Sequence, residues 1–377
     1  MRNKKKIIWI TPDAFLDTDL NYDVMSEILK FFDIHWLVYF PLKSRFKESD
    51  FKPFLDNNSN LTVDFFYSRT RERNPIKIFE YLKICKIVKK DKADIVYLNM
   101  GPISPWQIPM YYMLPSRKTI VTAHQGRVHE GMGHYKYYNF LRSIYYGKFK
   151  NVNMFSKSQA ELFMIEHPKS RIFQFLLGLK YFGEPTNKRP VYGDVRFLSF
   201  GTINYTKNID LLIDAACLLY ERGVRGFKVA INGVCKDWSW YQNKIRYPEV
   251  FENQIKMIDN SEIPNLFNGS HYLVQPYRVV SQSGPTKIAF RYNLPVLTSN
   301  LPGFKDEVIE GVNGYFFKKG DVEDLADKMQ MLIERHKINY SMLLHNEKTY
   351  TDGHYSLKVL AKQYIDMFNE VAYGADK

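Results

Sequence analysis

The stretch His271–Phe304, HYLVQPYRVVSQSGPTKIAFRYNLPVLTSNLPGF, contains two short apolar runs that are separated by a loop and one short helix. The runs HYLVQPY and PVLTS predict buried strands. Gly284 followed by Pro285 predicts a helix start, because proline at the first helical position loses no needed N–H and presets φ. The stretch therefore predicts a strand, a loop, a helix and a second strand.

The loop and the helix start in this stretch are suited to an anion. Between Pro276 and Asn293 there is no Asp or Glu. The same segment offers cationic, hydroxyl and amide side chains: Arg278, Lys287, Arg291, Ser281, Gln282, Ser283 and Thr286. A helix N-terminus in such surroundings attracts negative charge. An ordinary crossover with solvated basic residues explains the same composition, and the stretch alone does not decide between the two.

The length of 377 residues predicts about two domains with sizeable cores. Three cysteines that are far apart and lack metal-site spacing predict reduced, structurally buried thiols and a cytoplasmic protein: Cys85, Cys217 and Cys235. The first apolar run is too short for the core of a signal peptide. No run approaches the roughly 18 apolar residues of a membrane-spanning helix, so we expect no integral membrane protein.

Charge is distributed unevenly along the chain. Residues 1–190 contain 31 Lys and Arg against 18 Asp and Glu, whereas residues 191–377 contain 22 of each. The whole net charge of +13 therefore lies in the first half. A basic half predicts an anionic partner: phospholipid headgroups, a pyrophosphate-bearing substrate or nucleic acid. Nucleic acid is disfavoured, because the sequence has no recognised binding motif or regular stacking platform.

Two basic aromatic segments, residues 68–92 and 134–150, predict helices of different kinds. In the first, Ile76, Phe79, Leu82 and Val88 lie near one helical face, with lysines around it. We expect this apolar stripe to pack inward while the lysines are solvated: Lys83, Lys86, Lys89 and Lys90. The mixture of Tyr, Phe and Lys in the second segment is typical of a membrane interface.

The first half alternates strand-like and helix-like segments, which predicts a parallel sheet wrapped by helices. The loop after its first strand, TPDAFLDTD, lacks glycine, so a dinucleotide-type phosphate loop is not supported there. Residues 183–194, GEPTNKRPVYGD, predict an interdomain linker. The same alternation resumes at VRFLSF, so we predict α/β domains at residues 1–182 and 195–354.

Two further segments carry candidate site residues. The predicted strand TIVTA ends at His124, where ligands usually bind in an open α/β sheet, and Arg127 and His129 follow it. A structural role explains His124 alone more simply, and metal ligation is not expected because no carboxylate or cysteine has a familiar spacing. The loop Gly201–Asn208, GTINYTKN, places Lys207 at a predicted helix start. This start and the one at Gly284 could converge on one diphosphate.

Several segments together match the pattern of one known family: FLSFGTINYTKNIDLLIDA, NSEIPNLFNGSHYLVQPY, SQSGPTKIAF, NLPVLTSNLPGFKDEVIEGVNGYFFKKGD, VEDLADKMQMLI and, before them, TAHQGRVHEG. In these segments the chain resembles family-4 glycosyltransferases, which are retaining enzymes. The resemblance covers most of the length. It implies an α/β protein of the GT-B fold, with two Rossmann-like domains whose parallel sheets face a central cleft, and a final helix, residues 355–377, that packs back on the first domain.

The resemblance also implies roles for individual residues. Lys207 would hold the donor diphosphate, and His124 would sit against the transferred sugar, so these two are the catalytic candidates. The implied donor-binding set is Gly201, Thr202, Lys207, Arg278, Ser281, Gln282, Ser283, Gly284, Thr286 and Lys287. Arg127 and His129 would lie on the acceptor side. Fixed donors would stabilise the departing diphosphate without a metal or other cofactor, and the donor would be of the UDP or GDP type.

The sequence departs from the family pattern at three places. Thr202 stands where many members have an arginine, so Arg278 or Lys287 would have to meet one phosphate charge. The family's pair of glutamates falls on Val280 and Ile288, and the glycines after the first strand are missing. These departures allow a divergent subgroup or a protein that has lost catalysis. We favour the first, because the SQSG loop keeps polar groups and adds positive charge.

The resulting hypothesis is a cytoplasmic protein that associates peripherally with the inner face of a membrane. It would transfer a hexose from a nucleoside diphosphate sugar to a surface glycan that is lipid-linked, and its basic first domain would face anionic lipid. The rival hypothesis is a non-catalytic GT-B scaffold within a glycan-assembly complex. An epimerase of the same fold is a further alternative.

Overall fold

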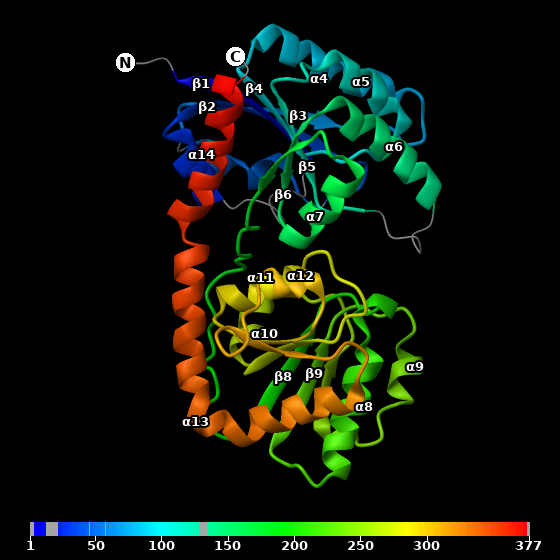
Figure 1. The fold of residues 1–377 in the computed structure, drawn as a ribbon, viewed down its shortest axis with the longest axis vertical. Helices are drawn as coiled ribbons and strands as arrows, with labels where there is room; N and C mark the ends of the chain where they lie inside the picture. Colours follow the sequence, from blue (N-terminus) through cyan, green and yellow to red (C-terminus); the bar gives the residue numbers. More distant parts are fainter. Residues whose placement is uncertain (1–3, 13–21, 45, 57, 128–133, 375–377) are drawn as a thin grey trace. The chain divides into compact units, whose positions relative to one another are not determined.

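The structure, a computed structural model, describes residues 4–374 except residues 13–21, 45, 57 and 128–133. It divides into two compact units. The first unit comprises Met1–Gly178 and Tyr355–Lys377, and the second comprises Leu179–His354. Each unit is an α/β structure built on one parallel sheet, which confirms the predicted fold class (Figure 1).

The sheet of the first unit has seven parallel strands among the described residues, in the order β3-β2-β1-β4-β5-β6-β7. The strands are β1 (Lys5–Pro12), β2 (Phe32–Phe40), β3 (Leu61–Tyr67), β4 (Ile95–Leu98), β5 (Thr119–Ala123), β6 (Asn151–Met154) and β7 (Arg171–Gln174). Central strands of such a sheet are covered on both faces, which explains why their sequences are continuous apolar runs instead of alternating ones.

Helices cover both faces of this sheet (Figure 1). Trp9 of β1 packs against Tyr364 and Phe368 on one face, while Ile8 and Ile10 face the opposite helices. The first face carries α2 (Tyr22–Leu29) and α14 (Leu357–Gly374); the other carries α4 (Lys77–Asp91), α5 (Ile108–Met113), α6 (Tyr135–Lys148) and α7 (Lys157–Glu166). Short turns complete the unit: η1 (Glu48–Asp50), α3 (Lys52–Leu55) and η2 (Pro105–Gln107).

The inward face of α4 differs from the predicted one. Ile76 and Phe79 are 57% and 64% exposed. The buried face is formed instead by Lys77, Tyr81, Ile84, Cys85 and Val88. These five positions follow the 3.6-residue period of a helix, whereas Ile76 and Phe79 fall outside their arc. The prediction that Ile76 and Phe79 pack inward is therefore wrong.

The sheet of the second unit has six parallel strands in the order β10-β9-β8-β11-β12-β13. They are β8 (Val195–Phe200), β9 (Phe227–Asn232), β10 (Phe251–Gln254), β11 (Tyr272–Gln275), β12 (Val296–Ser299) and β13 (Gly314–Phe317). The helices are η3 (Tyr205–Lys207), α8 (Ile209–Glu221), α9 (Trp238–Gln242), η4 (Pro248–Val250), α10 (Ile263–Asn268), α11 (Gly284–Arg291), α12 (Pro302–Lys305) and α13 (Val322–His354). The predicted strand, loop, helix and strand are β11, α11 and β12, so that prediction is confirmed.

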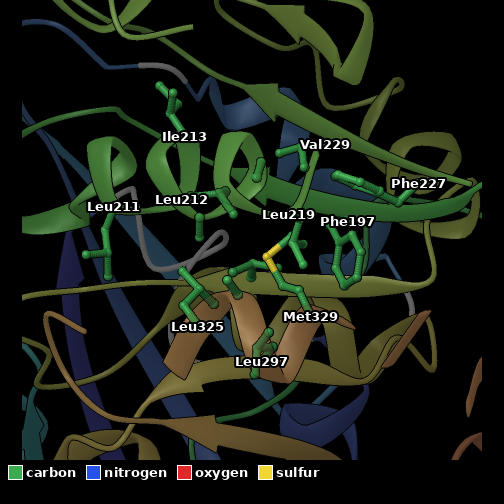
Figure 2. Packing of buried hydrophobic residues seen from close by; sticks show 14 of the residues in the cluster. Phe197, Leu211, Leu212, Ile213, Leu219, Phe227, Val229, Leu297, Leu325 and Met329 are labelled. Carbon is green, nitrogen blue, oxygen red and sulfur yellow. The ribbon is translucent and has the colours of Figure 1, made fainter. Parts of the chain in front are cut away.

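The core of the second unit fixes α8 against the sheet. Figure 2 shows Leu212 and Leu219 of α8 close to Phe197 of β8 and Met329 of α13. All four side chains are fully buried. Because α8 begins directly after the loop that follows β8, this packing also holds that loop at the carboxyl end of the sheet.

The predicted linker, residues 183–194, lies within the second unit, and the two units divide between Gly178 and Leu179. The backbone N–H groups of Thr186 and Asn187 donate to Oδ1 of Asn265, at 2.8 and 3.2 Å. The guanidinium of Arg189 donates to two backbone carbonyls after α11, at 2.6 and 2.8 Å. The polar composition of this segment thus reflects hydrogen bonds along the surface of the second unit.

Candidate functional site

The strand order of the second unit reverses between β8 and β11, and ligands of open α/β sheets bind at such a point. A Cβ placed on Gly201, directly after β8, would lie 3.9 Å from Cγ of Pro285 in the first turn of α11. A Cβ on Gly233 would lie 2.0 Å from the Gly201 carbonyl oxygen, and Gly233 has φ +148°, so only glycine fits there. The two segments that the sequence marked as suited to an anion therefore meet.

Lys207 lies at the end of the one-turn helix η3 instead of in the first turn of α8. Asn204 caps η3, and Asn208 takes a left-handed conformation with φ 55° before α8 begins. Nζ of Lys207 lies 3.7 Å from the centre of the Tyr277 ring, which follows β11. This contact places a cation at the meeting point of the two segments.

The start of α11 is ordered by a buried hydrogen-bond network around Gln275, the last residue of β11. Oγ of Ser283 accepts from the Thr286 N–H at 3.3 Å and from Nε2 of Gln275 at 2.5 Å. The Thr286 hydroxyl donates to Oε1 of Gln275 at 2.6 Å, and Gln275 also donates to the Tyr277 hydroxyl at 3.0 Å. Ser283 and Thr286 are buried. Their hydroxyls hold the loop in place, and Gly284 at the helix start is partly exposed.

The ammonium group of Lys180 also lies at this helix start, although no sequence motif includes this residue. A Cβ placed on Gly284 would lie 3.6 Å from Nζ of Lys180. The backbone N–H of Lys180 donates to the carbonyl of Lys287 in α11, at 3.4 Å. Lys180 stands outside every quoted motif, and no local pattern marks it. Only its tertiary position beside α11 identifies it as a candidate.

Two predicted donor ligands have other partners. Lys287 is fully buried and forms an ion pair with Glu307 at 2.9 Å, because the inward face of α11 carries it into the core. The prediction that Lys287 meets a phosphate charge is therefore wrong. Arg278 lies 2.9 Å from the Asp210 carboxylate and donates to the Tyr205 carbonyl at 2.5 Å. Asp210 balances its charge, so in this structure Arg278 is engaged within the second unit, and its phosphate contact stays a prediction.

The remaining donor-loop residues have mixed environments. The loop at Ser281 passes over Gly303, where a Cβ would lie 3.0 Å from the Ser281 carbonyl oxygen. Nε2 of Gln282 is buried without a hydrogen-bond partner in the described part of the chain. Thr202 is exposed, whereas Ile288, at one of the family's glutamate positions, is buried in the core.

The His124 loop lies in the first unit, at the carboxyl end of β5 as predicted. The His124 side chain is exposed, and its ring stacks on Phe155 at a centroid distance of 5.3 Å. Arg142 of α6 donates to the backbone carbonyls of Gln125 and Gly126, each at 3.0 Å. These hydrogen bonds attach the loop after His124 to α6. Arg127 pairs with Glu166 at 2.6 Å. His129 lies outside the described residues.

A pocket of about 900 Å³ opens in the second unit beside the loop that follows β8. Among the residues that the structure describes, no group of three or more His, Cys, Asp and Glu side chains is placed to hold a metal ion. None of the described helices is both long and apolar enough to cross a membrane.

Residues 187–344, nearly all of the second unit, match the family described as "Glycosyl transferases group 1". This segment is a glycosyltransferase group 1 domain. The group 1 domain contains the Gly201 loop, Lys207, the Gln275 network and α11. Part of the chain is also similar to the capsular polysaccharide biosynthesis glycosyltransferase CapM of Staphylococcus aureus, with 21% identity over 169 residues. The match spans 45% of this chain and 44% of CapM, less than half of either.

Solved structures resemble the whole chain, including the group 1 domain. A glycosyltransferase from Rickettsia africae matches with a TM-score of 0.70 and 16% identity, over 98% of this chain and 99% of the other. Sucrose-phosphate synthase from Thermosynechococcus elongatus matches with a TM-score of 0.73 and 12% identity, over 98% of this chain and 100% of the other. Anabaena HepE in complex with UDP and glucose matches with a TM-score of 0.68 and 12% identity, over 97% of this chain and 100% of the other. These likenesses show the GT-B fold of two Rossmann-like units that the sequence predicted.

Proposed function

We propose that the protein is a retaining glycosyltransferase that moves a hexose from a nucleoside diphosphate sugar to a lipid-linked surface glycan. The observation that carries the proposal is that Lys180 lies at the start of α11, next to the Gly201 loop, while Lys207 lies over Tyr277, which Gln275 links to Ser283 at that helix start. Two cations at a helix N-terminus suit a diphosphate. The group 1 domain supports a transferase, CapM's name supports a polysaccharide acceptor, and the UDP and glucose of the HepE complex support a nucleotide-sugar donor.

The proposed chemistry is electrostatic. Cleavage of the sugar–phosphate bond leaves negative charge on the diphosphate oxygens. The helix terminus at Gly284 and the ammonium groups of Lys207 and Lys180 would stabilise that charge in fixed positions, without a metal. Arg278 would contribute by bracing the η3 loop through Tyr205 and Asp210. His124 keeps the sugar-contacting role that the family resemblance gives it.

We further propose that the first unit binds the inner face of an anionic membrane from the cytoplasm. The support comes from neighbouring helices of that unit. Phe79 of α4, Tyr112 and Met113 of α5, and Phe140 of α6 are all more than half exposed. The exposed lysines of α4 lie on the same helix as Phe79. Large apolar side chains beside lysines suit the boundary between anionic headgroups and acyl chains.

The decisive experiment measures thermal stabilisation of the full chain by UDP, GDP, ADP and CMP, each tested separately. At about 100 times its dissociation constant, a bound nucleotide should add roughly 2.7 kcal/mol to the free energy of unfolding. We expect one of the diphosphates to stabilise the native protein and the Lys337→Ala control, and not Lys207→Ala. Stabilisation by none of the four would reject nucleotide-sugar binding.

A non-catalytic scaffold is the second candidate, because Ile288 is buried where the family places a glutamate. A scaffold would release no nucleoside diphosphate from any nucleotide sugar, even with membrane extracts as acceptor. Release of UDP or GDP that depends on both the extract and Lys207 would exclude it.

A further inference from the structure

The pocket beside the β8 loop includes Thr202 and Arg278 of the predicted donor-binding set, but its other lining residues are not members of that set. It is bounded by the segment Thr202–Tyr205 after β8, by the segment Val234–Asp237 after β9, and by α9. The backbone N–H of Ile203 donates to the Val234 carbonyl at 2.8 Å, so these two segments extend the sheet side by side and form a fixed floor. Neither Lys207 nor any residue of α11 lines this volume.

Two exposed aromatic residues line this pocket. Tyr205 and Trp240 are 75% and 53% exposed. Both are held in place: the Arg278 guanidinium lies 4.2 Å from the Tyr205 ring centre, and the Trp240 ring packs edge-on against Tyr241 at 4.8 Å. Exposed rings that are fixed in this way offer flat apolar surfaces at little cost in side-chain entropy.

The charges in the pocket balance. Two carboxylates, Asp210 and Asp237, line it together with two cations, Lys236 and Arg278. Asp210 and Arg278 pair directly at 2.9 Å. A phosphate group would gain little electrostatic stabilisation in this pocket, in contrast to the start of α11, where the helix N-terminus and Lys180 attract negative charge. The pocket instead suits an uncharged ligand that has apolar faces and many hydroxyl groups.

We propose that this pocket binds uncharged sugar units of the glycan. The C–H face of a pyranose ring would lie on Trp240 or Tyr205, and its hydroxyls would donate to the carboxylate of Asp237 and accept from the amide N–H₂ of Asn204, whose oxygen caps η3. Such a subsite would retain the glycan chain on the second unit, away from the diphosphate. This inference rests on the proposed transferase function, because that function supplies the glycan.

Cys235 provides a direct reporter for the pocket. It lines the pocket and is partly exposed, whereas Cys85 and Cys217 are buried. The experiment measures the rate at which N-ethylmaleimide alkylates Cys235 in the full chain, with peptide mass spectrometry to locate the adduct. The probes are neutral hexasaccharides of glucose, mannose, galactose, xylose and N-acetylglucosamine, with uridine and guanosine as competing ligands.

We expect at least one hexasaccharide to slow alkylation of Cys235 in a saturable way. Trp240→Ala and Tyr205→Ala should each weaken that protection by about tenfold, since each removes one stacking surface. Tyr192→Ala, which removes a ring that is 90% exposed outside the pocket, should leave it unchanged. Circular dichroism and thermal unfolding of each variant without ligand, compared with the wild type, show that it is folded.

Three results would overturn the inference: no hexasaccharide protects Cys235, protection survives in both aromatic variants, or a nucleoside protects Cys235 better than every sugar. Lys207→Ala separates this inference from the proposed function. In this variant the nucleotide should no longer stabilise the protein against thermal unfolding, whereas the hexasaccharide should still slow alkylation of Cys235. Nucleotide binding without sugar protection would reject the subsite alone, and sugar protection without any nucleotide binding would reject the transferase alone.

Discussion

Nζ of Lys207 lies 3.7 Å from the centre of the Tyr277 ring, so the segment after β8 and the segment after β11 are joined by a cation–π contact. Tyr277 in turn accepts a hydrogen bond from Gln275, whose amide also holds Ser283 at the start of α11. A contact of this type is worth about 0.5–1 kcal/mol at partly exposed sites. Its larger consequence is that it holds the Lys207 ammonium over the Tyr277 ring before any ligand binds.

Lys180→Ala should weaken binding of the stabilising nucleoside diphosphate by about tenfold, because it removes one cation from the start of α11. Unfolding of the unliganded protein should change little. Isothermal titration calorimetry with the wild type, Lys180→Ala and the exposed neighbour variant Lys188→Ala measures the effect. Equal affinities for all three proteins would show that Lys180 takes no part in the site.

Lys287→Ala should lower the free energy of unfolding of the second unit by about 3–5 kcal/mol, because it leaves the buried Glu307 carboxylate without its partner. The double variant Lys287→Met/Glu307→Leu should recover most of this loss. Urea unfolding measures both, and nucleotide binding by the double variant should match the wild type. Loss of binding in a stable double variant would restore Lys287 as a donor ligand.

Glu347→Gln should stabilise the protein near pH 7.5 by about 1–3 kcal/mol. Burial raises the pKa of the Glu347 carboxyl, so the folded protein holds a proton there that the unfolded chain releases above its ordinary pKa of 4.5. This group therefore costs stability as the pH rises above that value. The gain from Glu347→Gln should disappear near pH 4, as thermal unfolding at both pH values would show; a gain that is the same at both would contradict the argument.

His336 should produce the opposite pH dependence. Burial lowers the pKa of His336 from 6.5 to about 4. Between pH 6.5 and pH 4 the imidazole is therefore protonated in the unfolded chain and neutral in the folded protein. Stability from this group is present above pH 6.5 and is lost as the pH falls toward 4, by at most about 3 kcal/mol. His336→Phe should flatten the fall between pH 6.5 and 4 in urea unfolding. If the free energy of unfolding falls equally steeply between pH 6.5 and 4 in His336→Phe, other groups cause the loss of stability.

Removing the lysines of α4 should weaken binding to vesicles that contain phosphatidylglycerol by about tenfold or more at low salt. The variant replaces four residues by glutamine: Lys83, Lys86, Lys89 and Lys90. Its control replaces four exposed lysines of the second unit: Lys305, Lys319, Lys337 and Lys348. Phe79→Ser should weaken binding further in a way that salt does not affect. Vesicle sedimentation compares the proteins, and equal binding of the two fourfold variants would reject α4 as the contact surface.

The two α/β domains could be predicted from the sequence because their signals are local, whereas the GT-B fold was implied by the resemblance to a known family. Apolar runs such as those that become β11 and β12 identify buried strands, and the Gly284–Pro285 pair identifies the start of α11 through the fixed φ of proline. The strand order was decided by the tertiary structure, in which the consecutive strands β3 and β4 lie on opposite sides of the pair formed by β2 and β1. The sequence by itself therefore determined the two parallel sheets and the two segments that meet at the candidate site.

Which side chains are available at that site was decided only by the tertiary structure. Lys287 and Lys180 are both lysines near α11, yet one is buried against Glu307 and the other lies at the helix start. Arg278 is balanced by Asp210, and Phe79 is exposed although it stands among apolar helix residues. The physical reason is common to these cases: the availability of a charge or an apolar surface depends on partners from distant elements, which no local pattern contains.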